Sequence, residues 1–498
     1  MLALIAIYIL SALGLAVFGF NAFVLSATFL RHRHHAPPQP PDPEHWPSVV
    51  VQLPVYNERH VVERLLDAVA GLDYPPDRLT IQLLDDSTDD TSAIAQAHLD
   101  ARRQQGTDRP RIDHVRRGTR EGFKAGALSA GLEAAGDAEL VAIFDADFVP
   151  RPNFLRRVVP RFADEAIGLV QTRWSHLNPH YSSLTRAQAL ALDSHFVVEQ
   201  TARQRSGLFM NFSGTAGVWR RSCIEDSGGW QGDTLSEDID LSYRAQLRGW
   251  RFLYLPDVDS PAEIPPQMAA FKRQQVRWAT GTVQCLLKLW RPLLAARLTL
   301  WQRFQGFLHL SGYLVHPLLL LLLLSTIPLM LTGHLHNLPL APLGLAALGP
   351  PFMSLIAQIT LHRDWPGRIV YFPVFLLMGA GITLSNTLAV GRALAGKPDS
   401  FRRTPKFRLD SRQDRWTISA YALPIERTTW AELALALYAA SGGLLALTRS
   451  PSLVPFMALY AFGFGYVGGL GVLQARRLRT ERRRAHARHA LAGINAPQ

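Results

Sequence analysis

Two aspartates separated by one residue, Asp145 and Asp147, directly follow the apolar run at residues 140–144. If that run is a buried strand, both carboxylates can reach the same side of a cleft. Two carboxylates held in this way suit one hard divalent cation, Mg2+ or Mn2+, shared with a diphosphate. An isolated pair of this kind is equally compatible with loop capping, so the interpretation depends on the residues around it.

Two other apolar runs also end in acidic residues. Residues 49–55 are followed by Glu58, and residues 80–84 are followed by Asp85 and Asp86. A carboxylate at such a position can accept hydrogen bonds from the base or ribose of a nucleotide. The structural alternative is that Asp85 is bonded to backbone amides beside a helix cap.

Two further positions could handle a phosphate and a proton. Lys124 lies among small residues in the segment 122–126, where a phosphate could approach the backbone; a solvated lysine is the alternative.

Glu237 and Asp238 open a helical stretch, and acids are common in a first helical turn. Their order along the chain also matches a site that needs a general base, and a carboxylate can take the proton from an acceptor hydroxyl. We expect Asp238 to be this base.

The segment from Gln274 to Trp278 lies on an amphipathic stretch shortly before a long apolar run. Arg277 and Trp278 could anchor this stretch at a membrane interface. They could also act in a site, with Trp278 stacking on an acceptor sugar and Arg277 neutralising a departing diphosphate. The two roles are compatible.

The elements that must position these residues alternate in type. The β-rich runs 49–55, 80–84 and 140–144 alternate with helical stretches at 59–70 and 87–100. This alternation predicts a mostly parallel α/β sheet with helices on both faces. Ligands of such sheets bind beyond the carboxyl ends of the strands, where the acidic residues lie.

The composition divides the chain between two environments. The longest apolar stretches lie at the start and after about residue 300, whereas residues 45–300 have the composition of a charged globular domain. The formal net charge is +12, but the Lys and Arg clusters lie beside the apolar stretches. This distribution is typical of positive-inside membrane anchoring, so we expect contacts with membrane lipids and no nucleic-acid partner.

The apolar runs predict five membrane spans. Residues 1–30 have no basic segment before them and no small-residue cleavage site after them, so we expect a retained helix with the following residues in the cytosol. If residues 368–395 also crossed, the basic segment 402–408 and the basic tail would lie outside, so we expect 368–395 to be interfacial or re-entrant. The expected spans are 1–30, 306–332, 342–361, 430–448 and 453–474.

Four motifs in this order are similar to those of processive family-2 glycosyltransferases of the cellulose synthase superfamily. The resemblance is strongest to the cellulose-synthase-like A group of mannan and glucomannan synthases and their bacterial relatives. Ser236 departs from the cellulose synthases, which carry threonine there, and keeps the hydroxyl. The motifs are Asp85-Asp86, Asp145-x-Asp147, Glu237-Asp238 and Gln274-x-x-Arg277-Trp278, together with the segments 51–59 and 212–220.

A further segment resembles the gating-loop motif FxVTxK of that superfamily. It contains Phe401, Thr404 and Lys406, while Arg403 stands where the family has valine. The resemblance implies a cytosolic, nucleotide-responsive loop.

The resemblance also implies a fold, a reaction and residue roles. It implies a GT-A fold (Rossmann-like, mostly parallel) with a polytopic α-helical membrane region, a nucleotide-diphosphate sugar donor and an inverting, Mg2+- or Mn2+-dependent transfer. The implied site residues are Asp238 and Glu237 for catalysis, Asp85, Asp86, Glu58, Lys124, Asp145 and Arg277 for the nucleotide sugar, Asp145 and Asp147 for the metal, and Gly214, Thr215, Gln274 and Trp278 for the acceptor.

We therefore expect a multi-pass bacterial plasma-membrane enzyme that uses GDP-mannose or UDP-glucose to extend a β-linked polysaccharide, coupled to translocation. The sequence identifies no partner subunit. The expected domains are a membrane helix at 1–30, a linker at 31–47, a cytosolic catalytic domain at 48–270, interfacial helices at 271–300, a membrane region at 301–475 with a cytosolic loop at 397–427, and a basic cytosolic tail at 476–498.

Two alternatives remain open. A non-processive enzyme of the same fold would glycosylate a membrane lipid such as diacylglycerol or ceramide. The other alternative is a non-catalytic transporter or receptor. The intact set of carboxylates argues against a non-catalytic chain, and the spans contain few charged residues of the kind that mark an ion-coupled pathway, with Glu432 the chief exception.

Overall fold

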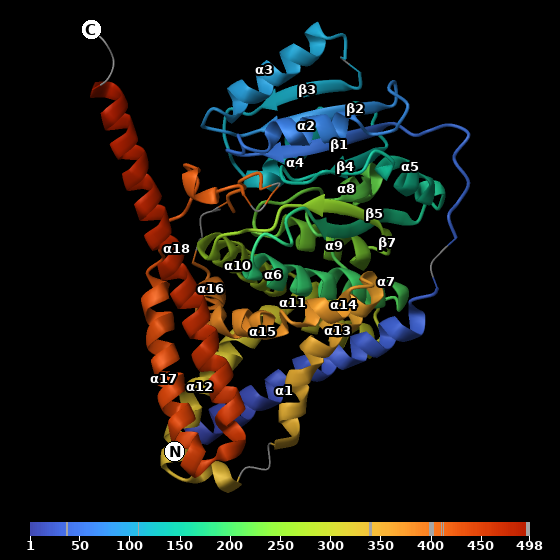
Figure 1. Cartoon of the computed structure of the whole chain (residues 1–498). Coiled ribbons are helices and arrows are strands. Elements are labelled where there is room, and N and C mark those ends of the chain that lie inside the picture. The colour runs from blue at the N-terminus through green and yellow to red at the C-terminus, as the bar shows by residue number, and fades with distance from the viewer. Residues whose placement is uncertain are drawn as a thin grey trace.

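The structure is a computed structural model that describes residues 1–35, 38–107, 109–337, 341–397, 403–409, 411 and 413–494. It combines a layered α/β domain with a region of long helices (Figure 1). The strands are β1 (Val49–Val55), β2 (Leu79–Asp85), β3 (Arg111–Arg116), β4 (Leu140–Ile143), β5 (Ile167–His176), β6 (Gly217–Arg220) and β7 (Arg251–Ala262).

These strands form one sheet in the order β3-β2-β1-β4-β6-β5-β7. β3, β2, β1 and β4 run parallel, whereas β6 is antiparallel to both β4 and β5. Val49 pairs with Leu79 on one side and with Leu140 on the other, so β1, β2 and β4 have their carboxyl ends at the same edge. The mostly parallel sheet predicted from the sequence is confirmed.

Helices cover both faces of the sheet, which explains why β1, β2 and β4 are almost entirely buried. Apolar residues of α2, α3 and α5 pack on one face, and those of α4, α8 and α9 pack on the other. The helices of this domain are α2 (Val62–Ala70), α3 (Thr91–Gln104), α4 (Phe123–Glu133), α5 (Phe154–Val158), α6 (Ser183–Asp193), α7 (Gln200–Arg205), α8 (Arg221–Asp226) and α9 (Glu237–Leu247).

The long helices come from the start of the chain and from Met268 onward. The helix expected at 306–332 is divided, because α11 ends at Leu310 before α12 begins. The helices are α1 (Leu2–His32), α10 (Met268–Ala295), α11 (Leu300–Leu310), α12 (Val315–Leu331), α13 (Gly349–Leu361), α14 (Trp365–Ile369), α15 (Phe372–Gly381), α16 (Thr383–Leu394), α17 (Thr428–Arg449) and α18 (Val454–Ile494).

Six helical stretches of the described chain are long and apolar enough to cross a membrane, one more than expected. The additional stretch is Trp365–Leu394, which is divided into α14, α15 and α16. In Figure 1 these helices lie across the direction of α17 and α18, at the end of the helical region nearest the sheet. This placement is compatible with an interfacial segment, and its membrane topology stays a prediction.

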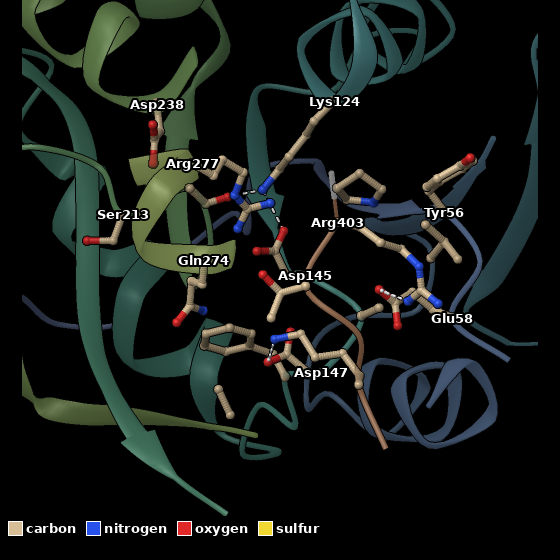
Figure 2. Close-up of a pocket in the computed structure, with 18 of the residues that line it drawn as sticks. Tyr56, Glu58, Lys124, Asp145, Asp147, Ser213, Asp238, Gln274, Arg277 and Arg403 are labelled. Atoms are coloured by element: carbon tan, nitrogen blue, oxygen red, sulfur yellow. Dashed lines mark hydrogen bonds and ion pairs between the residues drawn. The ribbon is translucent and has the colours of Figure 1, made fainter. Parts of the chain in front are cut away.

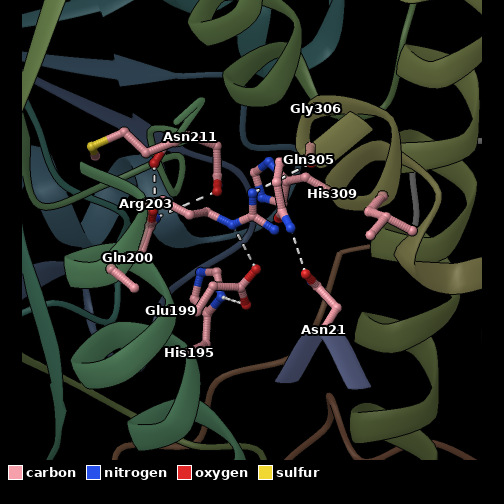
Figure 3. A network of polar contacts seen from close by, with 12 residues as sticks. Asn21, His195, Glu199, Gln200, Arg203, Asn211, Gln305, Gly306 and His309 are labelled. Carbon is pink, nitrogen blue, oxygen red and sulfur yellow. Dashed lines mark hydrogen bonds and ion pairs between the residues drawn. The ribbon is translucent and has the colours of Figure 1, made fainter. Parts of the chain in front are cut away.

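A buried polar network ties α1 to the α/β domain (Figure 3). Arg203 Nε donates to Glu199 Oε1 (2.8 Å), and Gln305 Nε2 of α11 donates to Asn21 Oδ1 of α1 (2.6 Å). Arg203 Nη1 also donates to the backbone carbonyl of Gln305 (3.5 Å). The network therefore fixes α1 and α11 against the π-helical stretch Ser194–Glu199 and α7 that follows it.

A second buried ionic contact joins α10 to α17. Lys272 Nζ lies 2.7 Å from Glu432 Oε1 and 3.1 Å from Glu426 Oε2, and Ser385 Oγ donates to Glu432 Oε1 (2.9 Å). Both Lys272 and Glu432 are buried. The acidic residue that stood out in the predicted spans is thus paired with the helix that carries Gln274 to Trp278.

Breaking this pair should destabilise the protein. Glu432→Leu leaves the Lys272 ammonium buried, with only the partly exposed Glu426 to compensate it, so we expect a loss of about 3 kcal/mol, the low end for a broken buried pair. Thermal unfolding in detergent measures it. The double variant Lys272→Met/Glu432→Leu removes both charges and should recover most of the melting temperature; an unchanged melting temperature in the single variant would contradict this role.

Candidate active site

One cavity opens at the carboxyl edge of β1, β2 and β4, with α9, α10 and residues 403–406 forming its other walls. Figure 2 shows Lys124, Asp145 and Arg277 converging at its centre. Most of the residues predicted from the sequence line this cavity. They are Glu58, Asp86, Lys124, Asp145, Asp147, Gly214, Glu237, Asp238, Gln274, Arg277, Trp278, Thr404 and Lys406.

The two aspartates of the predicted metal site each face a lysine. Lys124 Nζ lies 2.5 Å from Asp145 Oδ1, and Lys406 Nζ lies 2.5 Å from Asp147 Oδ2. Burial alone would lower the pKa of Lys124, but the negative charges of Asp145 and Glu237 raise it. The pKa of Lys406 is raised in the same way by Asp147, so both lysines are cationic and each places a positive charge beside a carboxylate of the predicted metal site.

The donor set suits a metal shared with a substrate. No cluster of three or more His, Cys, Asp or Glu side chains in the described part of the chain could hold a metal. Asp145 and Asp147 offer two carboxylates that reach the same cavity. Mg2+ and similar ions commonly take one or two protein carboxylates together with phosphate oxygens and water, so the site fits such an ion.

The backbone around Asp145 is held in place by a residue predicted to contact the acceptor. Thr215 is fully buried and does not line the cavity; its Oγ1 accepts a hydrogen bond from the backbone N–H of Asp145 (2.9 Å). Gly214 has φ of +78°, and an added Cβ would lie 3.0 Å from Asp238 Oδ2. A glycine is thus required at the point where this loop passes the predicted base.

Asp85 and Asp86 have different environments. Asp86 lines the cavity and is paired with Arg117, whereas Asp85 does not line it. Asp85 accepts hydrogen bonds from the backbone N–H of Ser87, from Ser92 Oγ (2.5 Å) and from His114 Nε2 (2.9 Å). Burial opposes these bonds, but together they hold the pKa of Asp85 below its usual range. Asp85 thus has the bonded environment of the structural alternative, and Asp86 is the one of the two that faces the cavity.

Asp238 has the environment expected of a base. Burial, then the charge of the adjacent Glu237, raises the pKa of Asp238 to about 7. The start of α9, which carries Asp238, packs closely on α10. A Cβ added at Gly281 of α10 would lie 2.1 Å from Ser236 Oγ, so the close contact requires a glycine there. Gly281 therefore brings the segment 274–278 next to Asp238.

Residues 403–409 are fixed over the cavity by ionic and backbone contacts. Arg403 lies 3.1 Å from Glu58 and 3.9 Å above the ring of Tyr421. Burial raises the pKa of Glu58 to about 8, against the nearby charges of Arg403 and Lys406. Glu263 accepts hydrogen bonds from the backbone N–H groups of residues 407 and 408 (2.8 and 2.9 Å). The arginine that departs from the family motif thus has specific partners. Phe401 lies outside the described residues.

Several cavity residues were missed by the sequence analysis. Tyr56 and Arg120 line the wall beyond β1, where the Arg120 guanidinium lies 3.4 Å from the centre of the Tyr56 ring. Trp174 and His176 line the opposite side, at the end of β5. The rule that located Asp85 and Asp145 applies equally to residues that end a strand, but β5 was not among the predicted strands.

The sheet order and the acidic residues at its edge define a GT-A fold. The mannosyltransferase PcManGT from Pyrobaculum calidifontis, solved in complex with GDP-Man and Mn2+, has this fold: it superposes with a TM-score of 0.54 at 23% identity, over 78% of this chain and 99% of that one. Residues 47–281 match the model of the family "Glycosyltransferase like family 2". This part of the chain is a family 2 glycosyltransferase domain, as the motifs predicted.

Curated plant proteins are also similar to this chain. Glucomannan 4-beta-mannosyltransferase 1 of Oryza sativa subsp. japonica is 40% identical over 265 residues, 52% of this chain and 50% of that protein. Glucomannan 4-beta-mannosyltransferase 2 of Arabidopsis thaliana is 44% identical over 248 residues, 49% of this chain and 46% of that protein. The chain thus spans about half the length of the curated relatives it matches.

The shifted pKa of Asp238 predicts the pH dependence of activity. A base must be ionised, so kcat/KM should rise with pH through about 7 as Asp238 loses its proton. Glu237→Gln removes the adjacent negative charge, which lowers the pKa of Asp238 and should move the rise to lower pH. The kcat/KM profile from pH 5 to 9 measures both. A rise at the same pH in the variant would contradict the coupling.

The contact between Lys406 and Asp147 predicts competition with a metal. Lys406→Ala removes the cation that lies 2.5 Å from Asp147, so Mn2+ should bind the nucleotide-free protein several-fold more tightly. Electron paramagnetic resonance of free Mn2+ gives the affinity. Lys288→Ala is the control, because Lys288 pairs with Asp233 and Asp240 and does not line the cavity. Unchanged or weaker binding in Lys406→Ala would refute competition.

Proposed function

We propose that this protein is an inverting, metal-dependent glycosyltransferase that uses a nucleotide-diphosphate sugar to extend a β-linked polysaccharide. The observation that carries the proposal is the single cavity in which Asp145 and Asp147, Lys124 and Arg277, and Asp238 meet. These groups supply the requirements of sugar transfer: cation binding, neutralisation of a leaving diphosphate and removal of a proton.

The donor would lie along β1, β2 and β4. Tyr56, Arg120 and Asp86 are on the nucleotide side of the cavity, and Lys124 and Arg277 lie where a diphosphate would reach Asp145. A bound Mg2+ or Mn2+ would offset the charge that develops on the leaving nucleoside diphosphate. GDP-mannose is the first donor to test, because the plant relatives are named mannosyltransferases and PcManGT was solved with GDP-Man; UDP-glucose is the second.

The acceptor would bind on the side of Gln274 and Trp278. Asp238 would take the proton from the attacking hydroxyl, whose oxygen forms the new bond to the anomeric carbon while the bond to the diphosphate breaks. Attack from the face opposite the leaving group inverts the anomeric configuration. The candidate membrane helices lie together on one side of the α/β domain (Figure 1), which supports a role in moving the product across the bilayer, with the catalytic domain in the cytosol.

The product distinguishes polymer synthesis from lipid glycosylation. Membranes containing the full chain are incubated with labelled GDP-mannose or UDP-glucose and with Mn2+ or Mg2+, and the organic extract is separated from ethanol-insoluble material. Label in insoluble material that an endo-β-mannanase or β-glucanase degrades supports the proposal. Label confined to the organic extract would replace it with glycosylation of a lipid such as diacylglycerol or ceramide.

Removing the base should abolish transfer without affecting donor binding. Asp238→Asn keeps the size of the side chain but cannot accept the proton, so we expect kcat to fall by about 10²- to 10⁴-fold with an unchanged donor Kd. Asp226→Asn on α8 is the matched control, because Asp226 pairs with Arg248 away from the cavity. Turnover close to that of the wild type in Asp238→Asn would remove the base assignment.

A further inference from the structure

His176 lies on the wall of the cavity opposite the nucleotide side. It is the last residue of β5, and it lines the cavity together with Trp174, two residues earlier on the same face of the strand. Trp174 approaches Trp278, with ring centroids 6.5 Å apart. In the sheet, β6 separates β5 from β4, the strand that leads to Asp145. His176 is therefore on the acceptor side.

A buried carboxylate fixes the orientation of this imidazole. His176 Nε2 lies 2.9 Å from Asp193 Oδ1, and Asp193 is 3% exposed. Burial opposes it, but the contacts with His176, His362 and Gln358 lower the pKa of Asp193, which is thus ionised. An ionised carboxylate can only accept, so it selects the tautomer that carries a hydrogen on Nε2.

This arrangement leaves the other ring nitrogen as an acceptor. Among the described residues, none forms a hydrogen bond with His176 Nδ1. A neutral imidazole with its hydrogen on Nε2 carries a lone pair on Nδ1, which can accept a hydrogen bond from a hydroxyl group. Saccharides carry many hydroxyl groups that could donate such a hydrogen bond.

The carboxylate also connects the cavity wall to a membrane helix. Gln358 Nε2 of α13 donates to Asp193 Oδ2 (2.9 Å), and His362 Nε2, directly after α13, lies 3.6 Å from the same oxygen. α13 belongs to the candidate span Leu343–Leu361. Asp193 thus holds the histidine of the cavity and the end of a candidate span through the same carboxylate.

We propose that His176 is an acceptor-binding residue whose Nδ1 accepts a hydrogen bond from a hydroxyl of the acceptor saccharide, and that Asp193 is the residue that positions it. This inference rests on the proposed function and deepens it, because it assigns the acceptor side of the cavity. It identifies the acceptor by its chemistry: a sugar hydroxyl beside an aromatic stacking surface, rather than the single hydroxyl of a lipid.

The first test separates acceptor binding from donor chemistry. Detergent-purified full chain is assayed with its active donor, GDP-mannose or UDP-glucose, using β-1,4-mannotetraose, cellotetraose or dioleoylglycerol as the acceptor probe. His176→Ala should raise the saccharide KM about tenfold, with kcat, donor KM and acceptor-independent donor hydrolysis within about twofold of wild type. His176→Asn, which places an amide oxygen near the position of Nδ1, should recover part of the loss.

The second test examines the positioning role. Asp193→Asn can donate to the imidazole as well as accept from it, so the hydrogen is no longer confined to Nε2 and the saccharide KM should rise although His176 is intact. In the double variant His176→Ala/Asp193→Asn, KM should be no higher than in His176→Ala alone. Additive effects would overturn the positioning role of Asp193.

Matched measurements exclude a general structural effect. His98→Ala is the control, because His98 pairs with Asp67 (2.8 Å) outside the cavity, and it should leave the saccharide KM unchanged. Each variant is also compared by melting temperature and donor Kd. A His176→Ala variant with unchanged saccharide KM, with kcat and donor KM altered as much as acceptor KM, or with an effect limited to dioleoylglycerol would overturn the proposal.

The two proposals fail in different ways. If wild-type protein neither transfers nor hydrolyses either donor, the proposed function fails, and the assignment of His176 fails with it. If wild-type protein transfers sugar to mannotetraose or cellotetraose and His176→Ala does so with the same KM, only the assignment of His176 fails.

Discussion

The pairing of four cavity carboxylates with cations is the constraint on which the site depends. Carboxylates collected at one edge of a sheet repel each other, and a nearby cation offsets this repulsion. Each of the four has a basic partner, and two of the partners come from the segment that follows α16. Charge thus joins the sheet to the helical region. The pairs are Asp86 with Arg117, Glu58 with Arg403, Asp145 with Lys124 and Asp147 with Lys406.

The end-of-strand rule located much of this edge from the sequence, because apolar runs and the polar residues after them are local patterns. It did not distinguish Asp85 from Asp86. That difference depends on His114 of β3, which lies 29 positions further along the chain and bonds Asp85 in the folded protein. The side of the cavity formed by Trp174 and His176 was missed for a related reason: β5 was not predicted as a strand.

Features that depend on direction or distance were also beyond the sequence pattern. Residues 365–394 are apolar enough for a span, yet the chain divides there into three helices. Hydropathy does not record the direction of a helix, so the sequence pattern could not show this division. Arg403 departs from its motif, and its ionic partner Glu58 is distant in sequence. The candidate spans contact α10 and the α/β domain through single polar residues such as Glu432 and Gln358, which hydrophobicity does not identify.

The location of residues 403–409 in the chain has a consequence for biosynthesis. Four of the six candidate spans precede this segment, whereas all seven strands precede the second span. Because a nascent chain folds from its N-terminus, the sheet and its carboxylates form before the ribosome has made Arg403 and Lys406. The cavity then lacks two of its cations until this later segment is made and folds back over the sheet. The groups that complete the cavity are therefore the last of its groups to be synthesised.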